Sequence, residues 1–142
     1  MMKKTNFILY TFILLFLGCN EPKFETKDFI GVWKADDGAS IVINQDGTCK
    51  LNDLNNTIIN ISQKEIKKIN AQGTWKKIDD VNSGITGSIS TGIEFSYTLM
   101  NRKGGTLFYI SGQGFNESKP PWNLFVWSGD PDDNIKYEFT KQ

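Results

Sequence analysis

The side chains that most often perform chemistry in proteins are unevenly represented in this sequence. Its 142 residues include 16 Lys and Arg, 16 Asp and Glu, two Cys and no His. The absence of histidine excludes a His-dependent triad, a His zinc site and a His general base. The balanced charge argues against nucleic-acid binding, which needs a basic face to meet phosphates. No Gly-x-Ser-x-Gly nucleophile motif occurs. We therefore expect no catalytic residue and no cofactor, and a protein that is not an enzyme.

The acidic residues gather beside turn signals. The pairs at 36–37 and 79–80 are flanked by such signals, and Asp130, Asp132 and Asp133 lie within four residues. Carboxylates at this spacing could hold Ca²⁺. However, the segment lacks the spacing of an EF-hand, and Pro131 after Asp130 is ordinary turn chemistry. We interpret all three clusters as solvated turns and expect no metal site.

Tryptophan is the other residue type with binding potential. Indole rings can stack on sugars or line a ligand cavity, although in a small domain they more often form the core. We select Trp33, Trp75 and Trp122 as possible ligand-contacting or barrel-floor residues. Trp122 follows two prolines, so we expect it to be the most exposed of them.

The first twenty residues have the organisation of an export signal. Lys3 and Lys4 form a basic start, and residues 7–17 are apolar except for Thr11. A membrane-spanning helix needs ~20 apolar residues, so this run is too short to span. It fits the apolar region of a secretory signal, which we exclude from the fold.

The residues that follow the apolar run, Phe16-Leu17-Gly18-Cys19, resemble the lipobox of bacterial lipoproteins. The resemblance implies cleavage between Gly18 and Cys19. It also implies lipid attachment at Cys19, as a thioether diacylglycerol and often an amide-linked acyl chain such as palmitate. The alternative is an ordinary secretory signal that happens to end in cysteine. Asn20 is not the aspartate that retains lipoproteins at the inner membrane, which favours the outer membrane, or the cell membrane if the source has only one.

These observations divide the chain into three parts. Residues 1–18 are the expected signal peptide, residues 19–28 the lipidated tether, and residues 29–142 one folded domain. We expect a monomer held at the membrane by its N-terminal lipid, because two or three acyl chains anchor a protein stably.

After residue 29 the sequence shows short apolar runs separated by turn residues. The Asp-Gly pairs at 37–38 and 46–47 are strong hairpin signals, and residues 101–105 and 129–132 are further turns. A three-residue loop at 45–47 with Gly47 left-handed would place Ile43 opposite Cys49 and Ile41 opposite Leu51. Because side chains alternate along a strand, these four would share the inner face. Cys49 is then a small buried hydrophobe.

The remaining apolar runs predict about eight strands. They lie at 30–35, 41–43, 49–51, 73–78, 93–100, 106–111, 124–127 and 135–139. In the last of these, we expect Ile135, Tyr137 and Phe139 on one face. The predicted fold is all-β, a small antiparallel up-and-down barrel, with a β-sandwich as the alternative.

One segment departs from the strand pattern. Ser62 and Glu65 form a capping box, and Ile61 and Ile66 occupy the positions of a hydrophobic staple. We predict a short helix over 63–70, which would cover one end of the barrel or only decorate a loop.

The residues from Phe29 to Trp33, followed by an Asp-Gly hairpin, resemble the start of lipocalin-like barrels. In these a Gly-x-Trp stands on the first strand and the indole closes the barrel floor. The order of motifs in segments 31–54, 73–76 and 123–139 is similar to that of small bacterial lipoproteins with a lipocalin-like (calycin-like) domain. The resemblance implies that Trp33 lies at the floor. The chain lacks the lipocalin disulfide pair and a clear arginine partner for Trp33.

Three functions follow as hypotheses. We favour a membrane-anchored, non-catalytic barrel that acts as an interaction or structural module at the cell envelope. Its partner would be an envelope protein. Bulky apolar side chains expected to point inward would consume the space for a ligand. The alternatives are a carrier of a small apolar ligand and, least favoured, an envelope enzyme.

Overall fold

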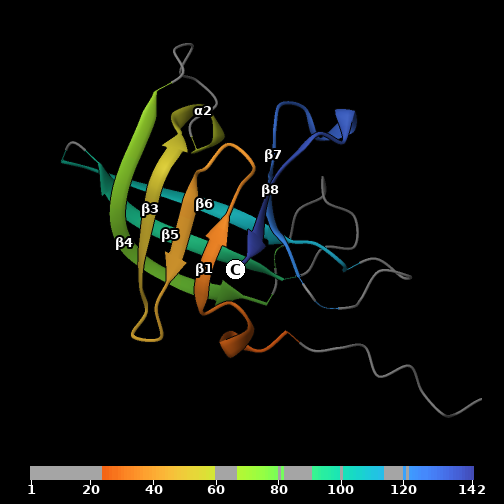
Figure 1. Ribbon diagram of the computed structural model, residues 1–142, viewed down its shortest axis with the longest axis horizontal. Coiled ribbons are helices and arrows are strands. Elements are labelled where there is room, and N and C mark those ends of the chain that lie inside the picture. The colour runs from red at the N-terminus through yellow and green to blue at the C-terminus, as the bar shows by residue number, and fades with distance from the viewer. Residues whose placement is uncertain are drawn as a thin grey trace, which may run out of the picture.

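The computed structural model describes residues 24–59, 67–79, 81, 91–99, 101–113, 120 and 122–142. Eight strands form a closed barrel in which each strand pairs with its neighbours in chain order and the last pairs with the first (Figure 1). All pairings are antiparallel. The predicted up-and-down barrel is confirmed, and the sandwich alternative is wrong. The strands are β1 (Gly31–Lys34), β2 (Ser40–Ile43), β3 (Thr48–Asn55), β4 (Lys68–Ile78), β5 (Gly92–Leu99), β6 (Arg102–Ile110), β7 (Leu124–Trp127) and β8 (Lys136–Lys141).

The register of the β2–β3 hairpin is the predicted one. Ile43 pairs with Cys49 and Ile41 with Leu51, and all four side chains are buried. Gly47 has φ +84°, the left-handed conformation that glycine adopts without strain. The Asp46 carboxylate accepts hydrogen bonds from the backbone N–H and hydroxyl of Thr48, which fixes the turn.

The predicted helix over 63–70 is wrong at its end, and a short helix is found before it. The structure has α2 at Asn56–Ile59, whereas Lys68 to Asn70, the end of the predicted helix, belong to β4. Residues 63–66 lie outside the described residues. Asn56 donates its backbone N–H to the Lys67 carbonyl (2.9 Å) and accepts from the Lys67 N–H through its side chain (2.8 Å). Strand-like pairing therefore already holds Lys67, and the helical spacing of isoleucines is overridden.

Close approach of β4 to β5 depends on one glycine. A Cβ atom at Gly73 would lie 1.9 Å from the backbone oxygen of Ser96, which is far inside van der Waals contact. Gly73 pairs with Cys49 on one side and Tyr97 on the other. The absence of a side chain thus lets β4 curve through the barrel wall.

Aromatic rings cross the barrel interior. Phe95 of β5 packs edge-on against Phe108 of β6, with ring centroids 5.0 Å apart. Phe108 packs in turn against Phe139 of β8 at 5.5 Å, and Phe139 against Tyr137 at 5.2 Å. The three phenylalanines are fully buried. These T-shaped contacts connect β5, β6 and β8 inside the barrel through the protein's own side chains.

The last strand begins and ends later than predicted. β8 runs from Lys136 to Lys141, and Ile135, expected on the same strand face as Tyr137 and Phe139, lies before the strand and is 56% exposed. It follows the turn formed by Pro131–Asp133 (η2) and Asn134, which has a left-handed backbone. The chain has therefore not yet entered the sheet at Ile135.

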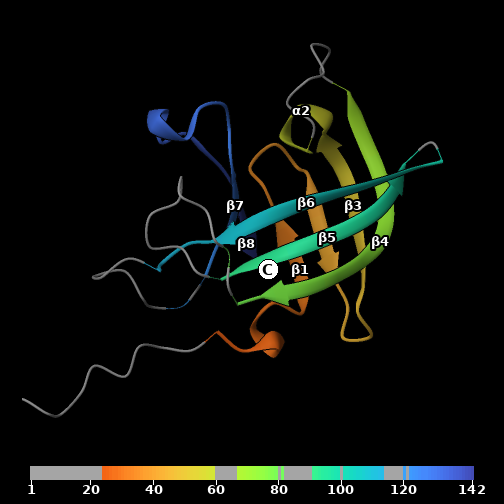
Figure 2. The ribbon, with the colours of Figure 1, turned by 180° about the vertical axis from the view of Figure 1, so that it is seen from behind.

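The two ends of the barrel carry different segments (Figures 1 and 2). At one end lie α2, the β1–β2 turn and the β7–β8 connection. At the other lie the β2–β3 turn and the short helix η1 (Thr26–Asp28). Among the described residues, no helix is long and apolar enough to cross a membrane.

Candidate functional site

The predicted lipid-attachment site lies outside the described residues. Gly18 and Cys19 precede Phe24, where the described part of the chain begins. Their assignment remains a prediction from the sequence. Phe24 itself lies 4.5 Å from Trp122 and 6.3 Å from Phe29, measured between ring centroids. The end of the predicted tether thus packs on the barrel.

The three selected tryptophans all lie in the hydrophobic core. The Trp33 indole is fully buried and donates to the Phe29 carbonyl (2.9 Å). The Trp75 indole donates to the Asn44 carbonyl (2.7 Å) at the β2–β3 turn. These partners place both rings toward the end that carries η1, where they contribute to closing the barrel.

The expectation that Trp122 is exposed is wrong. Its exposed fraction is 7%, because Phe24 packs edge-on against it. The two preceding prolines indicated a loop, but a loop tryptophan is still buried when the N-terminal segment covers it. The described geometry therefore offers none of the three indoles as a free stacking surface.

A lysine occupies the face of the Trp33 ring. Lys141 Nζ lies 5.8 Å from the ring centroid and donates to the Asp28 carbonyl (2.7 Å). The cation therefore interacts with the indole face while tying η1 to β8. The sequence contains no clear arginine partner for Trp33, and in the structure a lysine takes that place. The pairing of Lys141 opposite Trp33 across β1 and β8 could have identified it.

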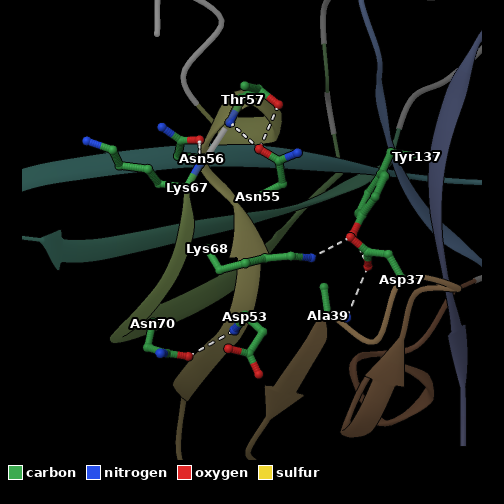
Figure 3. Close-up of polar contacts among 10 residues, drawn as sticks. All are labelled: Asp37, Ala39, Asp53, Asn55, Asn56, Thr57, Lys67, Lys68, Asn70 and Tyr137. Atoms are coloured by element: carbon green, nitrogen blue, oxygen red, sulfur yellow. Dashed lines mark hydrogen bonds and ion pairs between the residues drawn. The ribbon is translucent and has the colours of Figure 1, made fainter. Parts of the chain in front are cut away.

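A polar cluster lies at the opposite end of the barrel, where α2 is found (Figure 3). Asp37, in the β1–β2 turn, accepts hydrogen bonds from Lys68 Nζ (2.6 Å), the Tyr137 hydroxyl (2.6 Å) and the Ala39 N–H (3.1 Å). The local sequence of Asp37 predicts only a solvated turn residue. Its partners lie 31 and 100 residues further along the chain. The cluster therefore joins β1–β2, β4 and β8.

The protonation of this cluster is fixed by its contacts. The hydrogen bond from Lys68, followed by that from Tyr137, lowers the pKa of Asp37 to about 2. Burial, and then the neighbouring Asp37 carboxylate, raise the pKa of Tyr137 above its ordinary value. At neutral pH Asp37 is thus charged and Tyr137 neutral. Because neither group exchanges a proton near pH 7, the cluster is suited to hold the β1–β2 turn, β4 and β8 together rather than to catalyse proton transfer.

A half-open groove of about 340 Å³ lies beside this cluster. One wall is the β1–β2 turn and the other is β8, and the hydrogen bond between Tyr137 and Asp37 spans the gap between them. We call this the seam groove. It is lined by Ala35, Asp36, Asp37, Lys136, Tyr137, Glu138 and Thr140.

The remaining reactive groups are held in unreactive settings. Burial raises the pKa of the Cys49 thiol to about 11, so the thiolate is scarce at neutral pH. Asp130 accepts from the Asp132 N–H (3.0 Å), which is turn capping. Among the described residues, no group of three or more Cys, Asp or Glu side chains is arranged to hold a metal ion.

Comparisons with known proteins return no relatives. No protein-family model matches the chain. Nor does any curated protein or any solved structure.

Proposed function

We propose that this protein is a lipid-anchored module of the bacterial cell envelope whose barrel acts through its outer surface. Two features support the proposal. The leader ends in Gly18-Cys19 after a basic start and an apolar run of lipoprotein type. The chain then enters a barrel whose interior is occupied by its own aromatic side chains.

The packing of buried aromatic rings inside the barrel is the single observation that carries the proposal of a surface role. An eight-stranded barrel is just wide enough to be filled by side chains or to hold one small ligand. Here Phe95, Phe108 and Phe139 form a continuous chain of ring contacts from β5 to β8. A ligand in this space would have to displace them. A carrier of small apolar molecules is therefore the second candidate, supported by the fold class.

The proposal includes the absence of catalysis. The titratable groups that meet at the α2 end are held as an ionised Asp37 and a neutral Tyr137, which favours structure over proton transfer. Asn20 after the predicted lipidated cysteine favours the outer membrane, as expected by resemblance to lipoproteins. We further propose a monomer.

Cys19→Ala tests the anchor. The full chain and the variant are expressed in a bacterium with labelled fatty acid, and membrane and soluble fractions are separated. We expect the parent to carry label and to remain with membranes after a high-salt wash, because two or three acyl chains bind essentially irreversibly. The variant should carry no label.

Cys49→Ala is the matched control, because it removes the buried cysteine of β3 and leaves the leader intact. It should retain both label and membrane association. Equal labelling of the Cys19→Ala chain and the parent would contradict the anchor.

A further inference from the structure

The barrel closes between β1 and β8 over a very short ladder. β1 pairs with β8 only at Trp33–Lys141 and Lys34–Thr140. β7, by contrast, pairs with β8 from Leu124–Phe139 to Trp127–Lys136. Residues 136–138 therefore have β7 as a neighbouring strand on one side (Figure 1). The seam groove lies on their other side.

Two hydrogen bonds establish which backbone groups face this groove. The Gln142 N–H donates to the Val32 carbonyl, so Gln142 faces β1. The Ser128 N–H donates to the Ile135 carbonyl, so Ile135 faces β7. Because backbone direction alternates along an antiparallel strand, even-numbered residues of β8 face β1 and odd-numbered residues face β7.

Lys136 and Glu138 consequently direct their backbone N–H and C=O groups into the seam groove. Continuation of the β1 ladder would place Asp36 opposite Glu138. The chain has already turned there, since the Gly38 N–H bonds to the Ala35 carbonyl (3.1 Å). Within the described part of the chain, no strand pairs with these two residues on this side. They form a short open sheet edge of the kind that binds an extended peptide.

The groove has room for such a segment. Its volume of about 340 Å³ lies at the lower end of the ~300–1,000 Å³ typical of ligand sites. A strand that runs beside residues 136–138 would need roughly three residues, or ~10 Å, at ~3.3 Å per residue. The expected occupant is thus a short extended segment rather than a folded domain.

The charges that line the groove define the chemistry of the occupant. The Asp36 and Glu138 side chains are exposed on opposite walls, and in the described part of the chain neither forms an ion pair. The Asp37 charge is already engaged by Lys68. The Lys136 ammonium is drawn over the Phe125 ring at 4.7 Å. The Glu138 carboxylate accepts one hydrogen bond, from the neutral Asn123 amide (3.5 Å). The groove therefore keeps a net negative charge, because Asp36 and Glu138 together outnumber Lys136.

We propose that the seam groove binds an extended peptide segment with basic side chains, which adds as a strand to the β8 edge at Lys136 and Glu138. This inference rests on the proposed function, because it names the kind of partner that the anchored module would engage. Backbone hydrogen bonds to β8 hold the segment, and its lysine or arginine side chains pair with Asp36 and Glu138.

The binding test uses the full chain in detergent micelles and labelled hexapeptide probes, measured by fluorescence anisotropy. The probe Thr-Lys-Thr-Lys-Thr-Lys should bind saturably. The same peptide methylated at every backbone nitrogen should not bind, because it keeps its charges but cannot donate hydrogen bonds. The acidic analogue Thr-Glu-Thr-Glu-Thr-Glu should also fail.

Charge variants locate the site. Asp36→Asn combined with Glu138→Gln should weaken binding of the basic probe about five- to ten-fold, the effect of removing two exposed charge pairs. Glu94→Gln is the matched control, because it neutralises a part-exposed carboxylate of β5 that pairs with Lys76 away from the groove. It should leave the affinity unchanged.

Hydrogen exchange of backbone amides distinguishes strand addition from charge attraction, because only backbone hydrogen bonds to the peptide slow the exchange. Without peptide, the amides of Lys136 and Glu138 should exchange fast, and those of Tyr137 and Phe139 slowly, because the latter bond to β7. The basic probe should slow exchange at Glu138 and Lys136.

Equal binding of the methylated probe, unchanged exchange at these two amides, or no binding at all would overturn the inference. This result would leave the anchor untouched, since membrane association of the Cys19→Ala chain is measured independently. Conversely, loss of the anchor would not affect peptide binding.

Discussion

At the scale of single residues, the molecule depends on contacts between positions that are distant in the sequence. Asp37 is a turn residue by its local sequence, and its Asp-Gly context predicted no more than a hairpin. In the folded chain its carboxylate holds Tyr137 from β8 and Lys68 from β4. One carboxylate therefore ties the first hairpin to the far end of the chain.

The Asp37 contacts predict a specific pH dependence of stability. The folded-state pKa of about 2 lies below the ordinary value of 3.8, so Asp37 favours folding above about pH 4. This contribution is lost as pH falls from 4 towards 2. Because the Asp37 side chain is 39% exposed, we expect a loss below about 1 kcal/mol after solvent screening. In Asp37→Asn, the unfolding free energy should fall less steeply between pH 4 and pH 2 than in the parent. Urea melts from pH 2 to pH 7 measure this.

The control for this measurement is Asp36→Asn, which alters the adjacent turn carboxylate but none of the three hydrogen bonds to Asp37. Hydrogen bonds from Thr48 also lower the pKa of Asp46. Asp46 therefore contributes equally to the pH dependence of the unfolding free energy in the parent and in both variants, so its contribution cancels when they are compared. If the unfolding free energies of the parent and Asp37→Asn fell equally between pH 4 and pH 2, the hydrogen bonds to Asp37 would not contribute to stability.

At the scale of elements, local signals predicted the hairpins but not the long strand β4. Turn chemistry at 45–47 determines a register directly, because one left-handed glycine fixes which residues face each other. The capping box at 62–65 is equally local. Yet Lys68 and Ile69 pair with Asn55 and Leu54 of β3, and this non-local pairing outweighs the helical pattern.

Gly73→Ala tests the curvature of β4. The added Cβ would overlap the Ser96 carbonyl oxygen at 1.9 Å, so β4 and β5 would have to separate. We expect a loss of about 2–4 kcal/mol in a denaturant melt, at or above the usual range for overpacking. Gly105→Ala is the matched control, because a Cβ added at Gly105 would lie 3.4 Å from the Phe95 backbone oxygen, an ordinary van der Waals distance.

Gly105→Ala should change stability by less than about 1 kcal/mol, with a gain favoured because glycine weakens a strand interior. Equal effects of the two alanines would mean that β4 does not approach β5 closely at Gly73.

At the scale of the whole molecule, the closed barrel follows from period-two alternation repeated over successive strands. In β5, which lies within the predicted strand 93–100, the side chains of Ile93, Phe95 and Tyr97 are buried at alternate positions. What could not be predicted is how the ends are closed. The burial of Trp122 under Phe24, and the position of Lys141 over Trp33, depend on where the chain termini fold back. No periodicity encodes such contacts.

Trp33→Ala tests the closure of the barrel. Trp33 is fully buried, stacks near Phe29 at 6.4 Å, and lies under Lys141. Its truncation should cost ~3–5 kcal/mol of unfolding free energy, the usual cost of removing a buried aromatic ring. Val32→Ala, at the adjacent 38% exposed position, should cost less than about 1 kcal/mol. A loss below ~1 kcal/mol for Trp33→Ala would mean that the indole does not support the floor.

The central claim is that the barrel is filled and acts through its surface. Its most direct test is to titrate a folded chain that starts at Asn20 with a fluorescent fatty acid and other apolar probes. We predict no saturable binding, because Phe95, Phe108 and Phe139 already occupy the interior. Saturable one-to-one binding at micromolar or tighter affinity, competed by natural lipids, would contradict the claim and identify the protein as a carrier.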